Sequence, residues 1–206
     1  MSTATAARPQ RHTGAPRDSA ARSLARIAVF AALTAVLGIV PGIMVPGLAV
    51  PITLQTLGVM LAGAVLGPWK GFASQALFLG LVALGLPLLS GGRGGLGVFV
   101  GASAGFLYAW AIGALVTGLV VGAVLRSVRR TGKTGTLVLG TFLGCLLGGV
   151  VVLYAFGIPG MMIVNQISFQ AAATGSLAFI PGDLTKAVVA TALVAGLWKA
   201  YPRALQ

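Results

Sequence analysis

Long apolar runs recur between Ile27 and Trp198, and they constrain this 206-residue chain more than any other feature. Most of the runs approach the roughly 20 residues that a helix needs to cross a bilayer. Hydrophobic residues make up 57% of the chain and charged residues only 8%, which exceeds what a soluble domain needs. We therefore predict an all-α membrane protein that leaves no room for a soluble catalytic domain.

Hydropathy divides the apolar region into six predicted transmembrane helices and one less apolar segment. The fourth predicted helix is long enough to include a broken or interfacial start. The less apolar segment, residues 161–178, carries amide and hydroxyl side chains, which favours an interfacial or re-entrant segment before the last helix. The predicted helices cover residues 27–43, 52–66, 71–86, 96–125, 136–156 and 183–198.

Basic residues follow a pattern that predicts the orientation of these helices. The chain has 14 Lys and Arg against 2 acidic residues, and most of the basic ones fall near the termini or in two of the loops. Cytoplasmic segments of membrane proteins are enriched in Lys and Arg, so both termini are predicted to be cytoplasmic. Residues 1–25 are predicted to form a disordered basic tail, residues 26–199 a six-helix membrane domain, and residues 200–206 a short cytoplasmic tail. Because topology explains the basic excess, we predict no nucleic-acid partner.

Two charged residues, Asp183 and Lys186, lie inside the last predicted helix. An ionisable group at membrane depth costs about 2.5 to 3.5 kcal/mol on insertion scales, so it normally has a partner or a function. A spacing of three residues places both side chains on one helical face. They suit a ligand site, but Asp183 as a helix cap neutralised by Lys186 is an equally valid interpretation of the sequence.

Further polar residues are predicted on the same outer side of the membrane. Arg93 lies in the loop between the third and fourth predicted helices, and the others are Thr53, Gln55, Asn165, Gln166 and Gln170. Such a cluster suits a small polar or anionic solute, although a hydrated loop surface has the same composition. The candidate ligand-binding residues are Asp183, Lys186, Arg93, Gln55, Thr53, Gln166 and Gln170.

Residues for catalysis or metal binding are not combined in this sequence. The single histidine, His12, lies in the predicted tail, and the single cysteine, Cys145, lies in an apolar run where we expect it to pack. Without a serine, histidine and carboxylate arrangement, we predict no enzyme activity, no metal site and no cofactor. The glycine loop at residues 92–97 formally matches a dinucleotide-binding pattern, but it follows a predicted membrane helix rather than a strand.

Four stretches of sequence carry a family resemblance. They are residues 28–35 with alanines at helical spacing, Val-Pro-Ile-Thr-Leu-Gln-Thr-Leu-Gly at 50–58, Gly-Leu-Pro at 85–87, and Ile-Pro-Gly-Asp-Leu-Thr-Lys at 180–186. With them, the chain resembles the BioY family, the biotin-specific substrate-binding (S) component of energy-coupling factor transporters. Relatives typically read Gly-Pro-Thr-Gly-Gly-Tyr where residues 101–106 read Gly-Ala-Ser-Ala-Gly-Phe, so this chain lacks a tyrosine hydroxyl at Phe106.

The resemblance implies a high-affinity biotin-binding subunit in a prokaryotic plasma membrane. It implies that Asp183 accepts hydrogen bonds from the ureido nitrogens of biotin. For the biotin carboxylate, Lys186 is the first choice and Arg93 the second. An S component for another vitamin and a self-sufficient proton-coupled secondary transporter stay open as alternatives.

The resemblance also implies protein partners, namely a transmembrane coupling protein with paired ATPases. Small residues on the first predicted helix would let another helix approach closely, although ordinary internal packing requires the same spacing. The residues proposed to face the coupling protein are Ala28, Ala31, Ala32 and Ala35.

Overall fold

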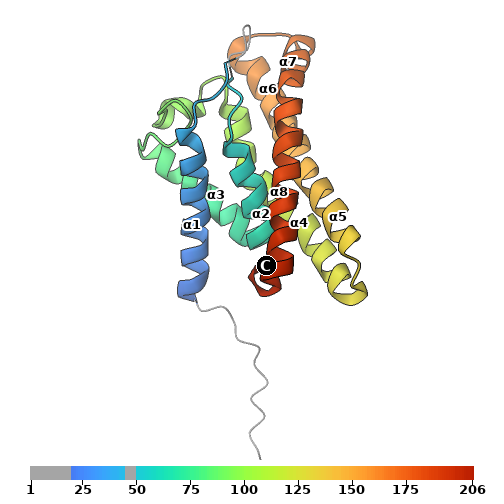
Figure 1. Ribbon diagram of the computed structural model, residues 1–206. Coiled ribbons are helices and arrows are strands. Elements are labelled where there is room, and N and C mark those ends of the chain that lie inside the picture. The colour runs from blue at the N-terminus through green and yellow to red at the C-terminus, as the bar shows by residue number, and fades with distance from the viewer. Residues whose placement is uncertain (1–19, 45–49) are drawn as a thin grey trace, which may run out of the picture.

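The computed structural model describes residues 20–44 and 50–206, and the regular elements in these ranges are all helical (Figure 1). The prediction of an all-α fold is confirmed for this part of the chain. Its principal helices are α1 (Ala20–Ile39), α2 (Gln55–Leu66), α3 (Pro68–Ala83), α4 (Ala104–Thr131), α5 (Thr134–Leu146), α6 (Leu153–Asn165), α7 (Phe169–Ser176) and α8 (Ile180–Ala200). Short 3₁₀ turns lie at Leu96–Phe99, Leu177–Phe179 and Pro202–Ala204, and a π-helical stretch at Leu147–Val152 joins α5 to α6.

Four helical runs in the described residues are long and apolar enough to cross a membrane. Two of them contain 32 residues each, which at a rise of 1.5 Å per residue gives roughly 48 Å, more than the hydrocarbon core requires. In contrast, α2 and α3 have 12 and 16 residues and are shorter than a straight span. The four runs are Ala20–Ile39, Ala104–Thr131, Thr134–Asn165 and Phe169–Ala200.

The helix α4 packs against the long run of α5 and α6 with almost no side chain between the backbones. A Cβ atom added at Gly105 would collide with the carbonyl oxygen of Phe156, and one at Gly113 would lie 2.6 Å from the carbonyl oxygen of Gly148. Small residues allow this kind of close approach between membrane helices. The glycines of α4 therefore fix its position relative to α5 and α6.

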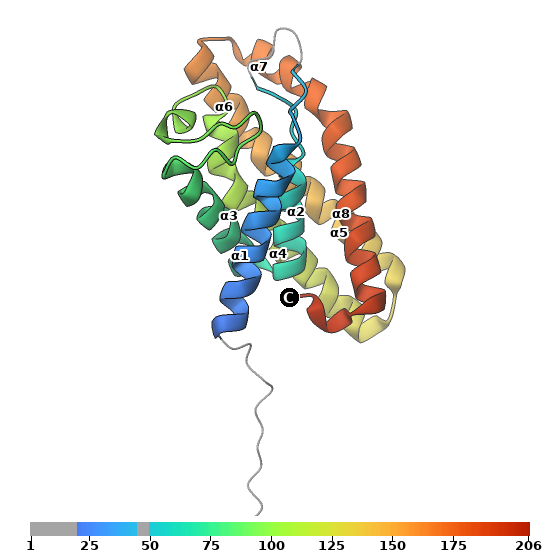
Figure 2. The same cartoon turned by 60° about the vertical axis from the view of Figure 1, so that its left-hand side comes forward.

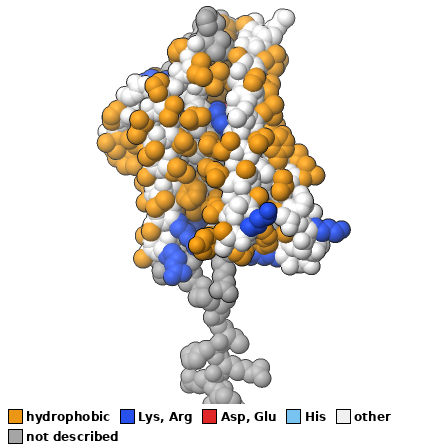
Figure 3. All heavy atoms as spheres, viewed as in Figure 1, with side chains coloured by type: hydrophobic (Ala, Val, Ile, Leu, Met, Phe, Trp, Pro, Cys, Tyr) orange, Lys and Arg blue, Asp and Glu red, His pale blue; other side chains and the backbone are white. Residues whose placement is uncertain are grey.

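The two ends of the bundle differ in charge. The described chain begins and ends at the same end of the bundle, the lower one in Figures 1 and 2. Lys and Arg side chains gather at this lower end of the face shown in Figure 3, whereas the flanks are mainly hydrophobic. This distribution is the one that the basic pattern of the sequence predicts for a membrane protein.

The last residues of the chain are packed rather than free. Leu205 is fully buried, the backbone N–H of Gln206 donates to the carbonyl oxygen of Val65, and Arg129 donates to the carbonyl oxygen of Leu205. The predicted tail at residues 200–206 is thus docked against α2 and α4. At the other terminus α1 begins at Ala20, inside the predicted tail of residues 1–25, and residues 1–19 of that prediction lie outside the described residues.

The segment predicted to be interfacial or re-entrant, residues 161–178, divides between the end of α6, the short helix α7 and the 3₁₀ turn that follows α7. Its first residues complete α6, and the chain then turns at Gln166, whose φ of 53° is left-handed. Ser168 starts α7 by accepting a hydrogen bond from the backbone N–H of Ala171. The polar side chains that suggested a re-entrant segment belong to this helical hairpin and its N-cap.

Candidate functional site

A pocket opens between α2, α4, α6 and α8 and the two non-helical segments that precede α2 and α4. Its empty space amounts to about 580 Å³, including the part that is open to solvent at its mouth. Its polar lining residues are Thr53, Gln55, Thr56, Arg93, Ser103, Tyr154, Asp183 and Lys186. Aromatic residues Phe106, Trp110 and Phe179 contribute to the apolar wall.

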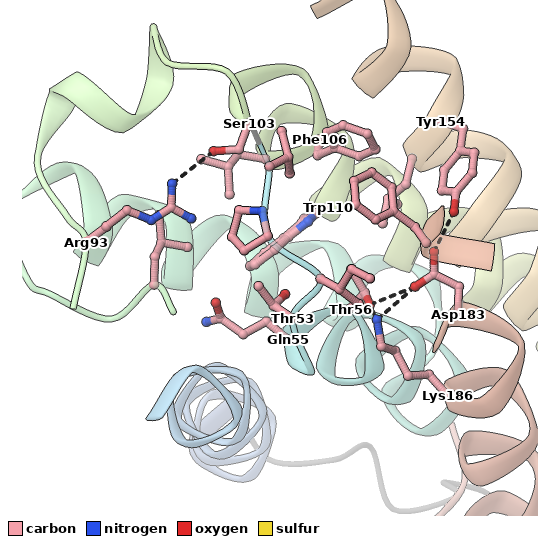
Figure 4. Close-up of a pocket in the computed structure, with 17 residues that line it drawn as sticks. Thr53, Gln55, Thr56, Arg93, Ser103, Phe106, Trp110, Tyr154, Asp183 and Lys186 are labelled. Carbon is pink, nitrogen blue, oxygen red and sulfur yellow. Dashed lines mark hydrogen bonds and ion pairs between the residues drawn. The ribbon is translucent and has the colours of Figure 1, made fainter. Parts of the chain in front are cut away.

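Asp183 and Lys186 form a buried ion pair at one side of this pocket (Figure 4). The Lys186 Nζ lies 2.8 Å from Asp183 Oδ1, and the two residues are only 6% and 5% exposed. Asp183 lies within α8 and makes no capping bond, because the helix begins at Ile180 after Phe179. The helix-cap interpretation is therefore wrong, and the predicted contact between the two charged side chains is confirmed.

Two hydroxyl groups complete the hydrogen bonding of this ion pair. Lys186 Nζ donates to Thr56 Oγ1 at 2.9 Å, and the Tyr154 hydroxyl donates to Asp183 Oδ2 at 2.8 Å. A buried ion pair is tolerated only when its remaining donors and acceptors are satisfied. Asp183 Oδ2 accepts only the Tyr154 bond among the described groups, so it keeps a lone pair for a donor on a ligand.

Arg93 lies on the opposite side of the pocket, on a glycine-rich turn (Figure 4). Leu89 and Arg93 exchange backbone hydrogen bonds of 3.0 and 3.2 Å, and Gly91 and Gly92 close the turn with φ angles of 79° and 68°. Glycine adopts such angles without steric cost. The turn thus directs Arg93 to a pocket whose only carboxylate, in the part of the chain described, is paired with Lys186.

The wall between these two sides is aromatic. The Phe106 ring meets those of Tyr154 and Phe179 edge to face, with centroids 6.1 and 5.9 Å apart. Trp110 is held by stacking on Phe78, with centroids 5.6 Å apart. Phe106 therefore contributes an apolar surface to the pocket although it has no hydroxyl, while the hydroxyl of Tyr154 is bonded to Asp183.

The structure brings five of the seven predicted ligand-binding residues together. Thr53, Gln55, Arg93, Asp183 and Lys186 all line the pocket. The amide of Gln55, however, is already used in hydrogen bonds to the backbone of neighbouring segments.

Gln166 and Gln170 do not line the pocket. Both are exposed on the hairpin between α6 and α7, and the Gln166 side chain donates to the carbonyl oxygen of Ile163. The predicted ligand contacts of these two residues have no geometric support, because α6 extends past the pocket before the chain turns.

Sequence reasoning missed Thr56, Tyr154 and Trp110. Thr56 lies in the first turn of α2, directly after the predicted site residue Gln55, and this position was a usable signal. Tyr154 comes directly after the π-helical stretch, where the phase of a helix changes and no regular periodicity applies. Trp110 gave no signal, because an apolar run of a membrane helix normally contains such residues.

The proposed partner-facing alanines of α1 divide between two faces. Ala28 and Ala32 are exposed, whereas Ala31 is only 3% exposed and packs in the core. Ala35 is half-buried and packs against the same core. Ala31 cannot meet a partner in this conformation, so the prediction is wrong for that residue.

Comparison with known proteins decides the family. The profile of the BioY family matches residues 7–203. The chain belongs to the BioY family. It is 46% identical over 182 residues to the biotin transporter BioY of Rhizobium etli, and the aligned region covers 88% of this chain and 95% of the relative. It is 49% identical over 183 residues to the biotin transporter BioY of Rhodobacter capsulatus, and the aligned region covers 84% of this chain and 91% of the relative.

A solved structure has a fold similar to that of this chain. The crystal structure of the S-component for biotin from an ECF-type ABC transporter is similar to this chain with a TM-score of 0.80 and 32% identity. The similarity covers 90% of this chain and 95% of the other. Together with its apolar helices, membership of this transporter family makes the chain a multi-pass membrane protein.

Proposed function

We propose that this chain is the biotin-binding S component of an energy-coupling factor transporter and captures biotin for uptake. The observation that carries the proposal is the pocket. It holds a hydrogen-bonded carboxylate on one side, a guanidinium that pairs with no carboxylate of the described residues on the other, and an aromatic wall between them. Its membership of the BioY family and its similarity to a biotin S-component support the same ligand.

The chemistry of biotin matches this arrangement. Its ureido ring offers two N–H donors, its thioether ring is apolar, and its flexible chain ends in a carboxylate. Asp183 Oδ2 accepts from a ureido nitrogen, and the rings of Phe106, Trp110 and Phe179 cover the thioether ring. The pocket thus offers a counterpart to each part of the ligand.

Arg93 replaces Lys186 as the first choice for the biotin carboxylate. Two of the three Nζ donors of Lys186 are used by Asp183 and Thr56, and the charge of Lys186 is neutralised within the chain. A guanidinium can bind a carboxylate through two parallel hydrogen bonds, and Arg93 retains donors for them.

The coupling protein docks on the exposed face of α1, which includes Ala28 and Ala32. Paired ATPases then drive release of biotin into the cell. We expect Ala28→Leu to leave biotin binding unchanged and to abolish co-purification with the coupling protein, because a bulky side chain separates the two helices. Loss of biotin binding in this variant would contradict an interface role for Ala28.

Six membrane crossings with both termini in the cytoplasm are the topology that suits this function. The basic residues at the end of the bundle where the described chain begins and ends support it (Figure 3). The shorter helices α2 and α3 contribute one crossing each, α2 together with the extended residues that precede it. In this topology the pocket lies towards the outside of the membrane, where biotin arrives.

Calorimetry on the detergent-purified chain tests the biotin assignment. We expect tight binding of biotin and no binding of thiamine or riboflavin. Binding of another vitamin in place of biotin would assign the chain to a different substrate. Biotin uptake into vesicles that lack ATPases, driven by a proton gradient, would instead show a secondary transporter.

A further inference from the structure

Gln55, one of the residues predicted to bind ligand, is fully engaged by the protein itself. It is only 1% exposed. Its Nε2 donates to the carbonyl oxygens of Thr34 at 3.1 Å and Leu88 at 3.0 Å, and its Oε1 accepts from the backbone N–H of Ser90 at 3.0 Å. These bonds use both amide donors, so the side chain has no N–H left for a ligand.

The bonds of Gln55 lead directly to Arg93. Ser90, whose N–H is held by Gln55, accepts the Arg93 Nε–H at its own carbonyl oxygen over 3.2 Å. The neighbouring residue Leu89 exchanges two backbone hydrogen bonds with Arg93. The Gln55 side chain is therefore one of the groups that hold the turn from which the guanidinium extends over the pocket (Figure 4).

The same side chain ties this turn to α1. Thr34 lies in the middle of α1 and is fully buried, and the Ser90 hydroxyl donates to the carbonyl oxygen of Val40 at the end of that helix. Gly38 permits the contact, because a Cβ atom there would lie 2.6 Å from Gln55 Nε2. The turn is held between α1 and α2 rather than resting on the surface.

We propose that Gln55 is a positioning residue that sets the place of Arg93 through Ser90, and that it makes no bond to the ligand. This role rests on the proposed function, in which Arg93 binds the carboxylate of biotin. It predicts that loss of the Gln55 amide weakens recognition of the carboxylate and leaves recognition of the ring system intact.

The test compares biotin with biotinamide, in which an uncharged amide replaces the carboxylate. The unmodified chain should prefer biotin, and Gln55→Met should lower the affinity for biotin about tenfold while changing that for biotinamide less than twofold. Arg93→Met should reduce the same preference, and the double variant should show no additional loss. Isothermal calorimetry gives each affinity.

Gln75→Met is the matched control. Gln75 is a second fully buried glutamine of the same network, and its Nε2 donates to Thr34 Oγ1 at 3.1 Å, but it neither lines the pocket nor bonds the Arg93 turn. We expect the preference for biotin over biotinamide to survive in this variant. If Gln55→Met does not fold, Gln55→Asn tests the same point, because its shorter side chain draws the amide away from Ser90.

Three results would overturn the positioning role. Equal weakening of both ligands by the Gln55 variants would show that the residue contacts the ring or shapes the whole pocket, and unchanged affinity for both would show that Arg93 needs no such support. Additive losses in the double variant would show that the two residues act separately. If the unmodified chain binds neither ligand, the biotin assignment itself is wrong, and the role of Gln55 in it fails with that assignment.

Discussion

The pocket has two charged sides that are built in different ways. On one side a single helix, α8, supplies Asp183 and Lys186, and these neutralise each other at 2.8 Å. On the other side a glycine turn supplies Arg93, which has no acidic partner among the described residues and is held by hydrogen bonds to Ser90 and Ser103. The helical side carries no net charge, whereas the loop side presents one positive charge to the pocket.

This difference separates the two tasks of a biotin site. A neutral ureido ring needs oriented donors and acceptors rather than net charge. The Asp183 carboxylate provides acceptors, and the third N–H of Lys186 provides a donor. A ligand carboxylate needs an uncompensated cation. The comparison therefore predicts that variants on the helical side affect folding and binding together, while variants on the loop side affect binding alone.

Asp183→Ala should have the largest effect. It leaves the ammonium of Lys186 buried without a counter-charge, and breaking a buried pair in this way costs about 3 to 5 kcal/mol of stability. Biotin binding should be lost as well. Denaturation in detergent and calorimetry measure the two effects. The double variant Asp183→Leu with Lys186→Met should recover much of the stability and none of the binding, and a double variant that binds biotin would contradict the role of Asp183.

Arg93→Met should weaken biotin binding strongly without destabilising the fold. We expect an affinity lower by about 10- to 100-fold, the usual effect of losing a hydrogen bond to a charged group. The unfolding temperature should change little, because the substitution breaks no ion pair in the described part of the chain and removes only two hydrogen bonds of the turn. Arg130→Met, at the exposed end of α4, is the control. A similar loss of affinity in the control would point to a general electrostatic effect.

Tyr154→Phe should have an intermediate effect. It removes only the hydroxyl that donates to Asp183 Oδ2, so the carboxylate keeps its charge but loses one constraint on its orientation. Affinity for biotin should fall roughly fivefold, less than for the loss of a direct hydrogen bond between a charged group and the ligand, because no contact to biotin itself is removed. Tyr108→Phe removes a hydroxyl that donates to the carbonyl oxygen of Phe99 on an exposed surface, and it should leave affinity unchanged. Equal effects of the two variants on affinity would show that the Tyr154 hydroxyl has no specific role in the binding site.

Gln166→Ala and Gln170→Ala should have the smallest effect. Both side chains are exposed on the α6–α7 hairpin and belong to neither side of the pocket. Affinity should stay within twofold of the unmodified chain, as is usual for exposed positions. A titration that shows a larger loss would mean that the hairpin folds over the bound ligand.

Most of the fold follows from the sequence, because the apolar runs and their Lys and Arg flanks are properties of the chain itself. Helix boundaries that depend on tertiary contacts could not be predicted from the sequence. A single residue, Gly67 with a φ of 86°, separates α2 from α3, and α2 is buried on nearly every side, which no property of a 12-residue apolar segment predicts. The hairpin at Gln166 likewise depends on a left-handed residue that is not a glycine.

The site was predictable where its members share one helix. Asp183 and Lys186 follow from helical spacing alone. The place of Gln55 in the network does not, because its partners are the backbone atoms of Thr34, Leu88 and Ser90, 21 to 35 residues away in the sequence. Tyr154 was hidden by the π-helical stretch, which rotates it relative to the start of α5.

The glycine contacts between α4 and α6 determine where the pocket can change shape. Gly105 lies so close to Phe156 and Gly160 that no side chain separates the two backbones at this crossing, which therefore cannot adjust by repacking. The opposite wall consists of residues 50–54 and 84–103, which are largely non-helical. We therefore expect any change in the shape of the pocket on ligand binding to occur in that wall, so that the rate of capture depends on these two segments rather than on the helical bundle.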